Sequence, residues 1–175
     1  GLVGSEMCIR DSLTPTKALG SDQLQATLRM TQGAGLEGIH PAPYDGDTPV
    51  ESRAGIREHS RYVFTNPDML HAGMLGSHAR WARLLRHLKY IVVDECHTYR
   101  GVFGANVALV LRRLLRIASA YGSSPTLIYA SATAADPAGQ ALRLSGREAV
   151  AVTDDAAPAG ERTIVLWEPG FIEGA

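Results

Sequence analysis

Cysteine and lysine are both scarce in this chain of 175 residues. Its two cysteines, Cys8 and Cys96, are far apart and form no C-x-x-C pair, which argues against a disulfide framework and against a zinc site. We therefore expect a reducing compartment and a cytoplasmic location. Lysine occurs twice against fifteen arginines. We attribute this bias mainly to GC-rich coding, although arginine also suits bidentate phosphate contacts.

The sequence also has no long apolar run and no excess of charge of one sign. No stretch reaches the roughly 20 apolar residues of a membrane-spanning helix, so no membrane partner is expected. A formal net charge of −1 provides no overall attraction to nucleic acid, and any such binding must come from local patches. The hydrophobic content of 45% and the length predict one globular domain with a substantial core.

The most informative stretch that is present runs from Tyr90 to His97. Four apolar residues lead directly into Asp94 and Glu95, followed by Cys96 and His97. A short continuous apolar run of this kind is typical of a strand buried on both faces of a parallel sheet. Ligands of open α/β sheets bind beyond the carboxyl ends of the strands. Asp94 and Glu95 are therefore expected where a metal-bound phosphate would lie.

Strands and helices alternate along the rest of the chain. We expect strands ending near residue 13 and at 38–44, 62–65, 90–93 and 126–130, with weaker ones near 149–152 and 163–167. We expect helices at 21–30, after residue 49, at 78–88, 103–121 and 136–144. The prolines at 41 and 43 demote the second strand to an edge or irregular position. The alternation predicts an α/β fold with a mostly parallel sheet.

Two helix starts and one charged stripe stand out in the pattern. Thr48 is a candidate N-cap before Pro49, and Asn66 is one before Pro67. In the helix after residue 49, arginines recur every four residues at positions 53, 57 and 61. We favour a solvated face for this stripe over a face that follows phosphates.

The segment 90–133 reads as a strand, a long helix and a second strand. Such a unit is almost always a right-handed crossover that joins parallel strands, so both strands end at the same edge of the sheet. Asp94, Glu95 and His97 then approach Ser131 and Thr133 if the two strands are neighbours. The turns after Pro15 and Thr65 belong to the same edge. Carboxylates, hydroxyls and helix N-termini on one rim predict a phosphate and metal environment.

Four short motifs at these strand ends resemble those of superfamily 2 helicases. Asp94-Glu95-Cys96-His97 resembles the DEAH/DExH box, the Walker B motif of that family. Residues 15–19 with Asp22-Gln23 resemble motif Ia, residues 65–71 resemble motif Ib, and residues 131–133 resemble motif III. Any one tripeptide is a weak signal, but four motifs in the family's order at the expected strand ends are a strong one.

The intervening sequence narrows the resemblance further. Residues 44–49 and 97–104 are similar to DNA helicases related to the bacterial mitomycin-damage repair helicase and the fungal RecQ-four-like helicase. The resemblance implies that residues 13–175 are a truncated first RecA-like motor domain, a mostly parallel sheet with helices on both faces. The P-loop signature G-x-x-x-x-G-K-[ST] is absent from the sequence. Residues 1–12 do not match, and residues 7–12 resemble translated adapter sequence, so we expect an artefactual segment there.

The resemblance implies roles at an ATP site. Asp94 would hold Mg²⁺, with water between, and Glu95 would polarise the water that attacks the γ-phosphate of ATP. His97, Ser131 and Thr133 would couple the ATP site to the nucleic-acid site. For His97 a hydrogen-bonded loop residue is a competing interpretation, and for the two hydroxyls helix capping before Asp136 is another.

The resemblance also implies a nucleic-acid site on the same rim. Thr16, Lys17, Thr65 and Asn66 would contact the phosphates of one strand, and Gly46 would let the backbone approach a phosphate. The implied partners are DNA, as a single strand or a duplex junction, and a second RecA-like domain of the same full-length protein.

Two other functions remain open from the sequence. The chain could be a nucleic-acid-binding piece that cannot hydrolyse ATP, because a P-loop supplies most of the phosphate cradle. It could also be a metal-dependent phosphohydrolase that uses Asp45, Asp47, Asp94 and Glu95. A turn is the favoured interpretation of Asp45 and Asp47, and no further His/Asp cluster supports the hydrolase.

Overall fold

A computed structural model of the chain describes residues 9–13, 17–132 and 135–154, and also residues 160, 163 and 165. Its described residues form one five-stranded sheet in the order β2-β3-β1-β4-β5, and every neighbouring pair is parallel. The strands are β1 (Ile9–Leu13), β2 (Pro41–Pro43), β3 (Tyr62–Thr65), β4 (Leu88–Val93) and β5 (Thr126–Tyr129). The predicted α/β fold with a parallel sheet is confirmed.

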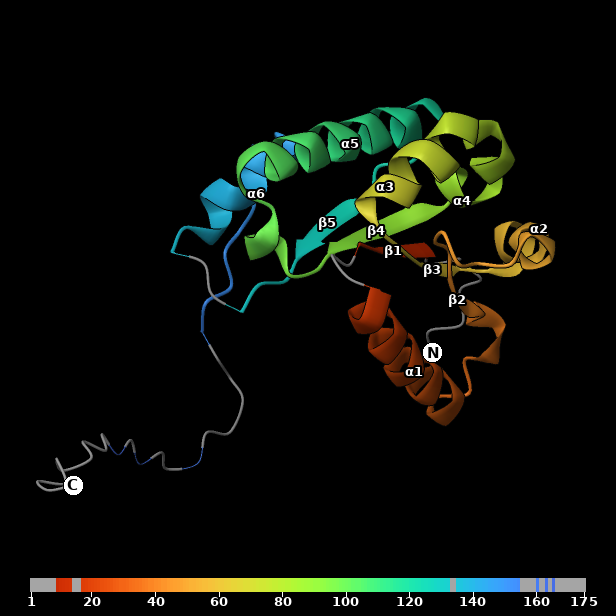
Figure 1. The fold of residues 1–175 in the computed structure, drawn as a ribbon, viewed down its shortest axis with the longest axis horizontal. Coiled ribbons are helices and arrows are strands. Elements are labelled where there is room, and N and C mark those ends of the chain that lie inside the picture. Colours follow the sequence, from red (N-terminus) through yellow and green to blue (C-terminus); the bar gives the residue numbers. More distant parts are fainter. Residues whose placement is uncertain are drawn as a thin grey trace, which may run out of the picture.

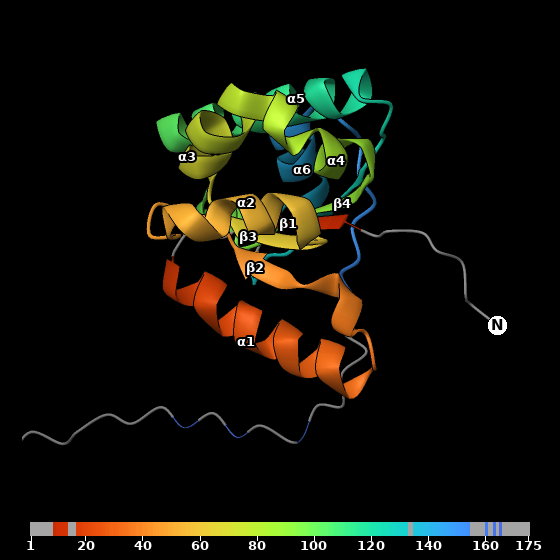
Figure 2. The same cartoon turned by 90° about the vertical axis from the view of Figure 1, so that its right-hand side faces the viewer.

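Helices cover both faces of this sheet (Figures 1 and 2). The α-helices are α1 (Lys17–Gly33), α2 (Val50–His59), α3 (Pro67–Met69), α4 (Ala82–Arg86), α5 (Gly101–Ala120) and α6 (Pro137–Ser145). Between them lie η1 (Glu37–Ile39), the π-helix η2 (Leu70–Met74), the 3-10 helix η3 (Leu75–Trp81) and η4 (Cys96–Thr98). Figure 2 shows α1 on one face and α3, α4 and α5 on the other. None of the helices formed by the described residues combines the length and the apolar character that a membrane crossing requires.

The main core lies between the sheet and α5. The buried residues of α5 recur at helical spacing and so form one apolar face: Gly104, Val107, Ala108, Leu111, Leu114, Leu115 and Ala118. They pack with Val63 of β3 and with Ile91 and Val93 of β4, all of which have no exposed surface. Trp81 is 1% exposed and packs edge-on against Tyr44, so it is a core residue.

Several element boundaries differ from the sequence-based expectation. The strand expected at 38–44 is reduced to three residues at the sheet edge, preceded by η1. The helix expected at 78–88 is replaced by η3, which has a kink at Ser77, then by α4, and Leu88 already belongs to β4. Residues 149–152 form no strand, and of 163–167 only 163 and 165 lie within the described residues.

The predicted N-caps have different outcomes. Asn66 caps α3, because its side chain accepts a hydrogen bond from the Met69 N–H at 2.8 Å. Thr48 is not an N-cap: the N-cap position of α2 is Pro49, without a side-chain hydrogen bond. The Thr48 hydroxyl instead bonds within its own turn, to Asp45.

Strand β1 occupies the centre of the sheet, between β3 and β4. It includes Ile9–Ser12, four of the twelve residues expected to fall outside the family match, and it ends at Leu13, as expected. Residues 1–8 lie outside the described residues. The register of β1 with both neighbours brings the start of α1 to the edge where β3 and β4 end.

Candidate functional site

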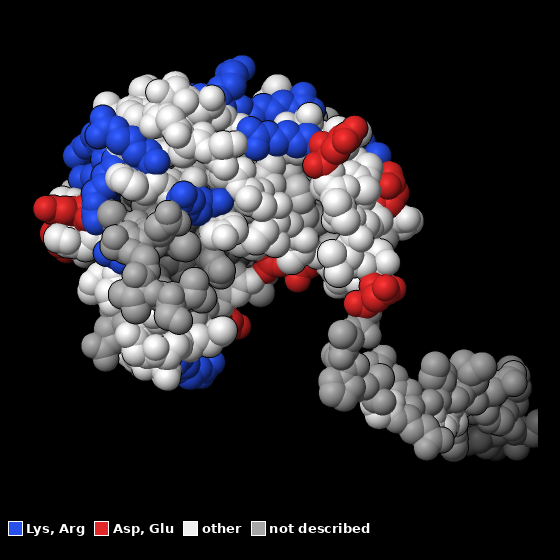
Figure 3. All heavy atoms as spheres, turned by 180° about the vertical axis from the view of Figure 1, so that it is seen from behind, with Lys and Arg blue, Asp and Glu red and all other residues white. Residues whose placement is uncertain are grey.

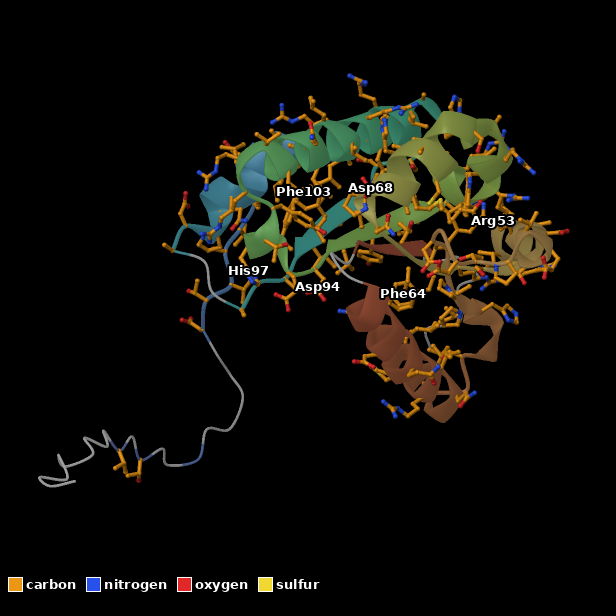
Figure 4. All side chains as sticks on the ribbon, in the orientation of Figure 1. Arg53, Phe64, Asp68, Asp94, His97 and Phe103 are labelled. Carbon is orange, nitrogen blue, oxygen red and sulfur yellow. The ribbon has the colours of Figure 1, made fainter. Side chains whose placement is uncertain are left out.

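Four strands end at the same level of the sheet. Leu13 is paired with Thr65 and with Val93, and Val93 is paired with Tyr129, so the last residues of β1, β3, β4 and β5 are in register. β4 and β5 are parallel, as predicted, and they are direct neighbours, which was the condition for their polar ends to meet. Figure 4 shows Asp94 and His97 at this end of the sheet, with Arg53 on the far side of the molecule beside α2. The rim therefore has an acidic half after β4 and β5 and a second half after β2 and β3.

Asp94 is half-buried at the end of β4, and both of its carboxylate oxygens are held. Oδ1 accepts the Glu95 N–H at 2.8 Å, and Oδ2 accepts the side-chain amide of Gln23 from α1. Each carboxylate oxygen has about two acceptor positions, so acceptor capacity remains. A carboxylate with spare acceptor positions at a strand end fits a hard cation bound through water. The sequence pattern includes Gln23 in a motif but does not predict its contact with Asp94.

Glu95 turns the chain sharply away from β4. Its φ of 48° and ψ of 38° lie in the left-handed region, which non-glycine residues rarely adopt. Its Oε2 lies 3.2 Å from Nδ1 of His97, and both side chains are about one-third exposed. The contact lacks hydrogen-bond geometry, and His97 Nδ1 has no hydrogen-bond partner among the described residues. The two side chains therefore face each other as a close polar pair rather than as a hydrogen bond.

Cys96 joins this turn to the end of β5. Its N–H donates to the carbonyl of Ala130 at 3.0 Å, and the Ala130 N–H donates to the carbonyl of Val93 at 3.0 Å. Burial raises the pKa of the Cys96 thiol, and a hydrogen bond with the Ser131 side chain opposes that shift. Ser131 thus contacts Cys96 within the Asp-Glu-Cys-His segment. Thr133 lies outside the described residues, and the cap of α6 is Asp136, whose Oδ1 accepts the Gly139 N–H.

Tyr99 is a buried residue next to the acidic half. The residue is 4% exposed, and its hydroxyl has no hydrogen-bond partner among the described residues. Burial raises the Tyr99 pKa well above its usual value, and the negative charge of Asp94 raises it further. Gly104 of α5 lies directly against the Tyr99 backbone, since a Cβ at Gly104 would lie 2.5 Å from the Tyr99 carbonyl oxygen. A glycine is therefore required for this close approach.

The second half of the rim is built around the carbonyl of Tyr44. Thr65 is 3% exposed, and its hydroxyl donates to the Tyr44 carbonyl oxygen at 2.8 Å. The Tyr44 N–H donates in turn to the carbonyl of Phe64 at 2.7 Å. Thr65 thus fixes the turn that carries Gly46, which is exposed at its tip. Asn66 follows Thr65 at the start of α3 and is half-buried.

Arginine side chains of α2 support this turn. Arg53 Nε donates to the Thr48 carbonyl at 3.0 Å, and its guanidinium lies 5.6 Å from the centre of the Tyr44 ring. Arg57 donates to the Tyr44 hydroxyl at 3.4 Å. The expectation of a merely solvated face is wrong for these two residues, since both hold the turn in place.

The carboxylates of this turn serve the backbone. Asp45 Oδ1 accepts hydrogen bonds from the Asp47 N–H and from the N–H and hydroxyl of Thr48, at 3.0 to 3.1 Å. This is a side-chain-stabilised turn of the predicted kind. In the described ranges, no group of three or more His, Cys, Asp or Glu side chains could hold a metal ion.

Two expected nucleic-acid contacts fall at the start of α1. Lys17 is the first residue of this helix, which begins four positions after the end of β1. Thr16 lies outside the described residues. Lys17 thereby begins its helix beside the edge at which Thr65 and Val93 end their strands.

Basic side chains are concentrated away from the acidic rim. Figure 3 shows Lys and Arg side chains gathered over the helical layer in the upper part of that view. Exposed arginines of this layer come from η3, α4 and α5, at positions 80, 83, 86, 112 and 116. A chain with a net charge of −1 therefore has a local basic patch.

Comparison with known proteins places this geometry in a family. A model described as DEAD/DEAH box helicase matches residues 12–141. The uncharacterized ATP-dependent helicase YprA of Bacillus subtilis is 44% identical over 160 residues, which cover 91% of this chain and 21% of YprA. The ATP-dependent helicase HRQ1 of Saccharomyces cerevisiae is 42% identical over 162 residues, which cover 90% of this chain and 15% of HRQ1.

A solved structure is similar in fold as well as in sequence. The crystal structure of the DUF1998 helicase MrfA bound to DNA and AMPPNP superposes with a TM-score of 0.86 at 45% identity. The match covers 89% of this chain and 22% of that chain. The α/β fold thus matches a portion of a RecA-like helicase domain, and the chain spans about a fifth or less of the length of these relatives. With the family model matching well over half of its residues, the chain belongs to the DEAD/DEAH box helicases.

Proposed function

We propose that this chain is the first RecA-like motor domain of a longer ATP-dependent DNA helicase that acts in DNA repair. In that protein, nucleic-acid-stimulated ATP hydrolysis would be coupled to translocation along a strand. The observation that carries the proposal is the joining of Asp94 and Glu95, at the end of β4, to the end of β5 through the backbone of Cys96. The DNA and AMPPNP in the MrfA structure support the choice of DNA and of ATP.

The acidic half is the ATP-hydrolysing part of the proposal. Glu95 would act as the base that orients and polarises the attacking water, and His97 would restrain the Glu95 side chain that it faces at 3.2 Å. Asp94 would hold Mg²⁺ through water, with the carboxylate oriented by the Gln23 amide and the Glu95 N–H. When bound, Mg²⁺ would neutralise charge on the phosphates of ATP. Ser131, in contact with Cys96, and Thr133 would couple this half to the nucleic-acid site.

The half after β2 and β3, together with the start of α1, is the nucleic-acid part. Thr16, Lys17 and Asn66 would contact the phosphates of one DNA strand, at a single-strand region or duplex junction. Thr65 would present the strand end through its backbone, since its hydroxyl holds Tyr44, and the exposed Gly46 turn would approach a phosphate. Such contacts position a strand without reading its sequence. A second RecA-like domain of the same protein would complete the site.

For the isolated chain, we propose nucleic-acid binding without ATP hydrolysis. The sequence contains no G-x-x-x-x-G-K-[ST] motif, and such a loop supplies most of the contacts to the transferred phosphate. The low cysteine content supports a reducing compartment such as the cytoplasm.

The decisive experiment is a Glu95→Gln substitution in the full-length protein, with ATP turnover measured with and without DNA. Removal of the base is expected to lower the DNA-stimulated kcat by about 10²- to 10⁴-fold. Glu58→Gln is the matched control, because this glutamate side chain is 74% exposed on α2. Unchanged turnover in Glu95→Gln would refute the proposal. DNA cleavage that requires a metal but no ATP would instead favour the phosphohydrolase.

A further inference from the structure

The carbonyl oxygen of Cys96 accepts a hydrogen bond from a helix that the proposed mechanism does not use. Gln140 of α6 donates its side-chain amide to this oxygen at 2.5 Å, across 44 residues of sequence. Gln140 is 8% exposed, although glutamine is mostly found at protein surfaces. The burial of this amide against the backbone of the Asp-Glu-Cys-His segment indicates a structural role at that segment.

The helix that carries Gln140 is firmly placed. Its first turn is capped by Asp136, and Ala141, Leu144 and Ser145 are buried. Arg112 of α5 donates to the Arg143 carbonyl at 2.9 Å and ties the two helices together. The Gln140 amide is thereby presented from a rigid element rather than from a loop.

Cys96 is consequently held on both of its peptide groups. Its N–H donates to the Ala130 carbonyl, which follows β5, and its carbonyl accepts the Gln140 amide. The end of β5 and helix α6 are therefore both joined to the same residue, next to Glu95. A displacement of either element must break one of these hydrogen bonds or move the Glu95 peptide with it.

We propose that Gln140 is a positioning residue that sets the orientation of Glu95 by holding the Cys96 carbonyl. Through this contact, the end of β5, helix α6 and the Asp-Glu-Cys-His segment move as one unit. This inference rests on the proposed function, because it assigns Gln140 a part in ATP turnover. Glu95 occupies the left-handed backbone region, which persists only where the surroundings hold it. The hydrogen bonds made by the N–H and the carbonyl of Cys96 supply that support, one residue away from Glu95.

The effect of losing Gln140 is expected in catalysis more than in stability. The Cys96 carbonyl also accepts the Tyr99 N–H at 3.1 Å, so it keeps one partner when the amide is removed. The cost of an entirely unsatisfied buried carbonyl is thereby avoided. A reacting group displaced by about 1 Å can nevertheless lose about 10²-fold in rate.

The test is Gln140→Met in the full-length protein, a change that keeps the length of the side chain and removes its donors. The DNA-stimulated kcat is expected to fall about tenfold while KM for ATP stays within about twofold, because the substitution misplaces the base and leaves the nucleotide contacts intact. Gln140→His, which retains an N–H donor, is expected to recover a large part of that loss. Leu142→Met, on the exposed side of the same helix, is the control and should behave as wild type.

Two comparisons separate the possible outcomes. Wild-type kcat in Gln140→Met, with Glu95→Gln inactive in the same assay, would overturn the role of Gln140 and leave the proposed function standing. Normal turnover in Glu95→Gln would overturn the proposed function itself. If Gln140→Met does not fold, Gln140→Asn decides, since it keeps a neutral amide but is one methylene too short to reach the Cys96 carbonyl: the tenfold loss in kcat supports the inference, and wild-type kcat refutes it.

Discussion

The two halves of the rim differ in the balance of backbone and side-chain interactions that hold them. In the acidic half, after β4 and β5, the backbone groups of Val93, Cys96 and Ala130 bond directly to one another. In the half after β2 and β3, one backbone bond joins Tyr44 to Phe64, and the turn that follows is held by the side chains of Thr65 and Arg53. Backbone bonds between neighbouring strand ends fix positions closely, which suits groups that must orient one water. Side-chain supports leave more freedom, which suits contact with a flexible strand.

Gly104→Ala is expected to disturb the acidic half most strongly. The added Cβ would lie 2.5 Å from the Tyr99 carbonyl oxygen, so α5 or the loop after η4 must move. Overpacking of this kind costs about 1–3 kcal/mol, and a fall in ATP turnover should accompany it. The measurement is denaturant unfolding of the chain, together with ATPase of the full-length protein.

Gly55→Ala in α2 is the matched control in the other half. Among the described residues, nothing lies within 4 Å of a Cβ at Gly55, so alanine should raise stability by about 0.5–1 kcal/mol through its helix preference. The contrast between the halves fails if both substitutions shift the free energy of unfolding in the same direction.

Thr65→Val is expected to act on the half after β2 and β3 alone. It leaves the buried Tyr44 carbonyl without the hydroxyl that donates to it, at a cost of about 1–2 kcal/mol. The turn with Gly46 loosens, so affinity for single-stranded DNA should fall while KM for ATP stays unchanged. Fluorescence anisotropy with labelled DNA measures the first quantity and steady-state kinetics the second.

Thr126→Val offers the control for this change, because Thr126 is exposed on β5 and the substitution should alter stability by less than about 0.5 kcal/mol. If Thr65→Val raised the KM for ATP by the same factor as it weakened DNA binding, the two halves would not act separately.

The smallest effect concerns the Cys96 thiol. Burial raises the pKa of this thiol, so at pH 8 it is protonated, and the reactive thiolate is scarce. In a Cys8→Ser background, native Cys96 should react with iodoacetamide at least about tenfold more slowly than the same cysteine in denaturant, and the native rate should rise with pH. Equal rates in the two states at pH 8 would contradict the close packing of the acidic half.

Much of this arrangement could be predicted from local pattern. The apolar run before Asp94 predicts β4, and the strand–helix–strand order predicts that β4 and β5 are parallel, which the register confirms. That the two strands are neighbours came from the structure. The Asn66-Pro67 pair predicts a helix start, confirmed by the cap. The N-cap prediction for Thr48 was wrong because the same hydroxyl can cap a helix or close a turn. Here it bonds to Asp45 and closes the turn.

The sequence by itself determined the order of the elements, the type of the fold and the rim on which the polar residues meet. These follow from periodicity and from the handedness of crossovers, which depend on local chemistry and on general geometry. Only the tertiary structure decided that Gln23 holds Asp94, that Gln140 holds the Cys96 carbonyl and that Gly104 admits the Tyr99 backbone. Those pairs depend on how distant elements pack, and a side chain's long-range partner leaves no periodic trace in its neighbours along the chain.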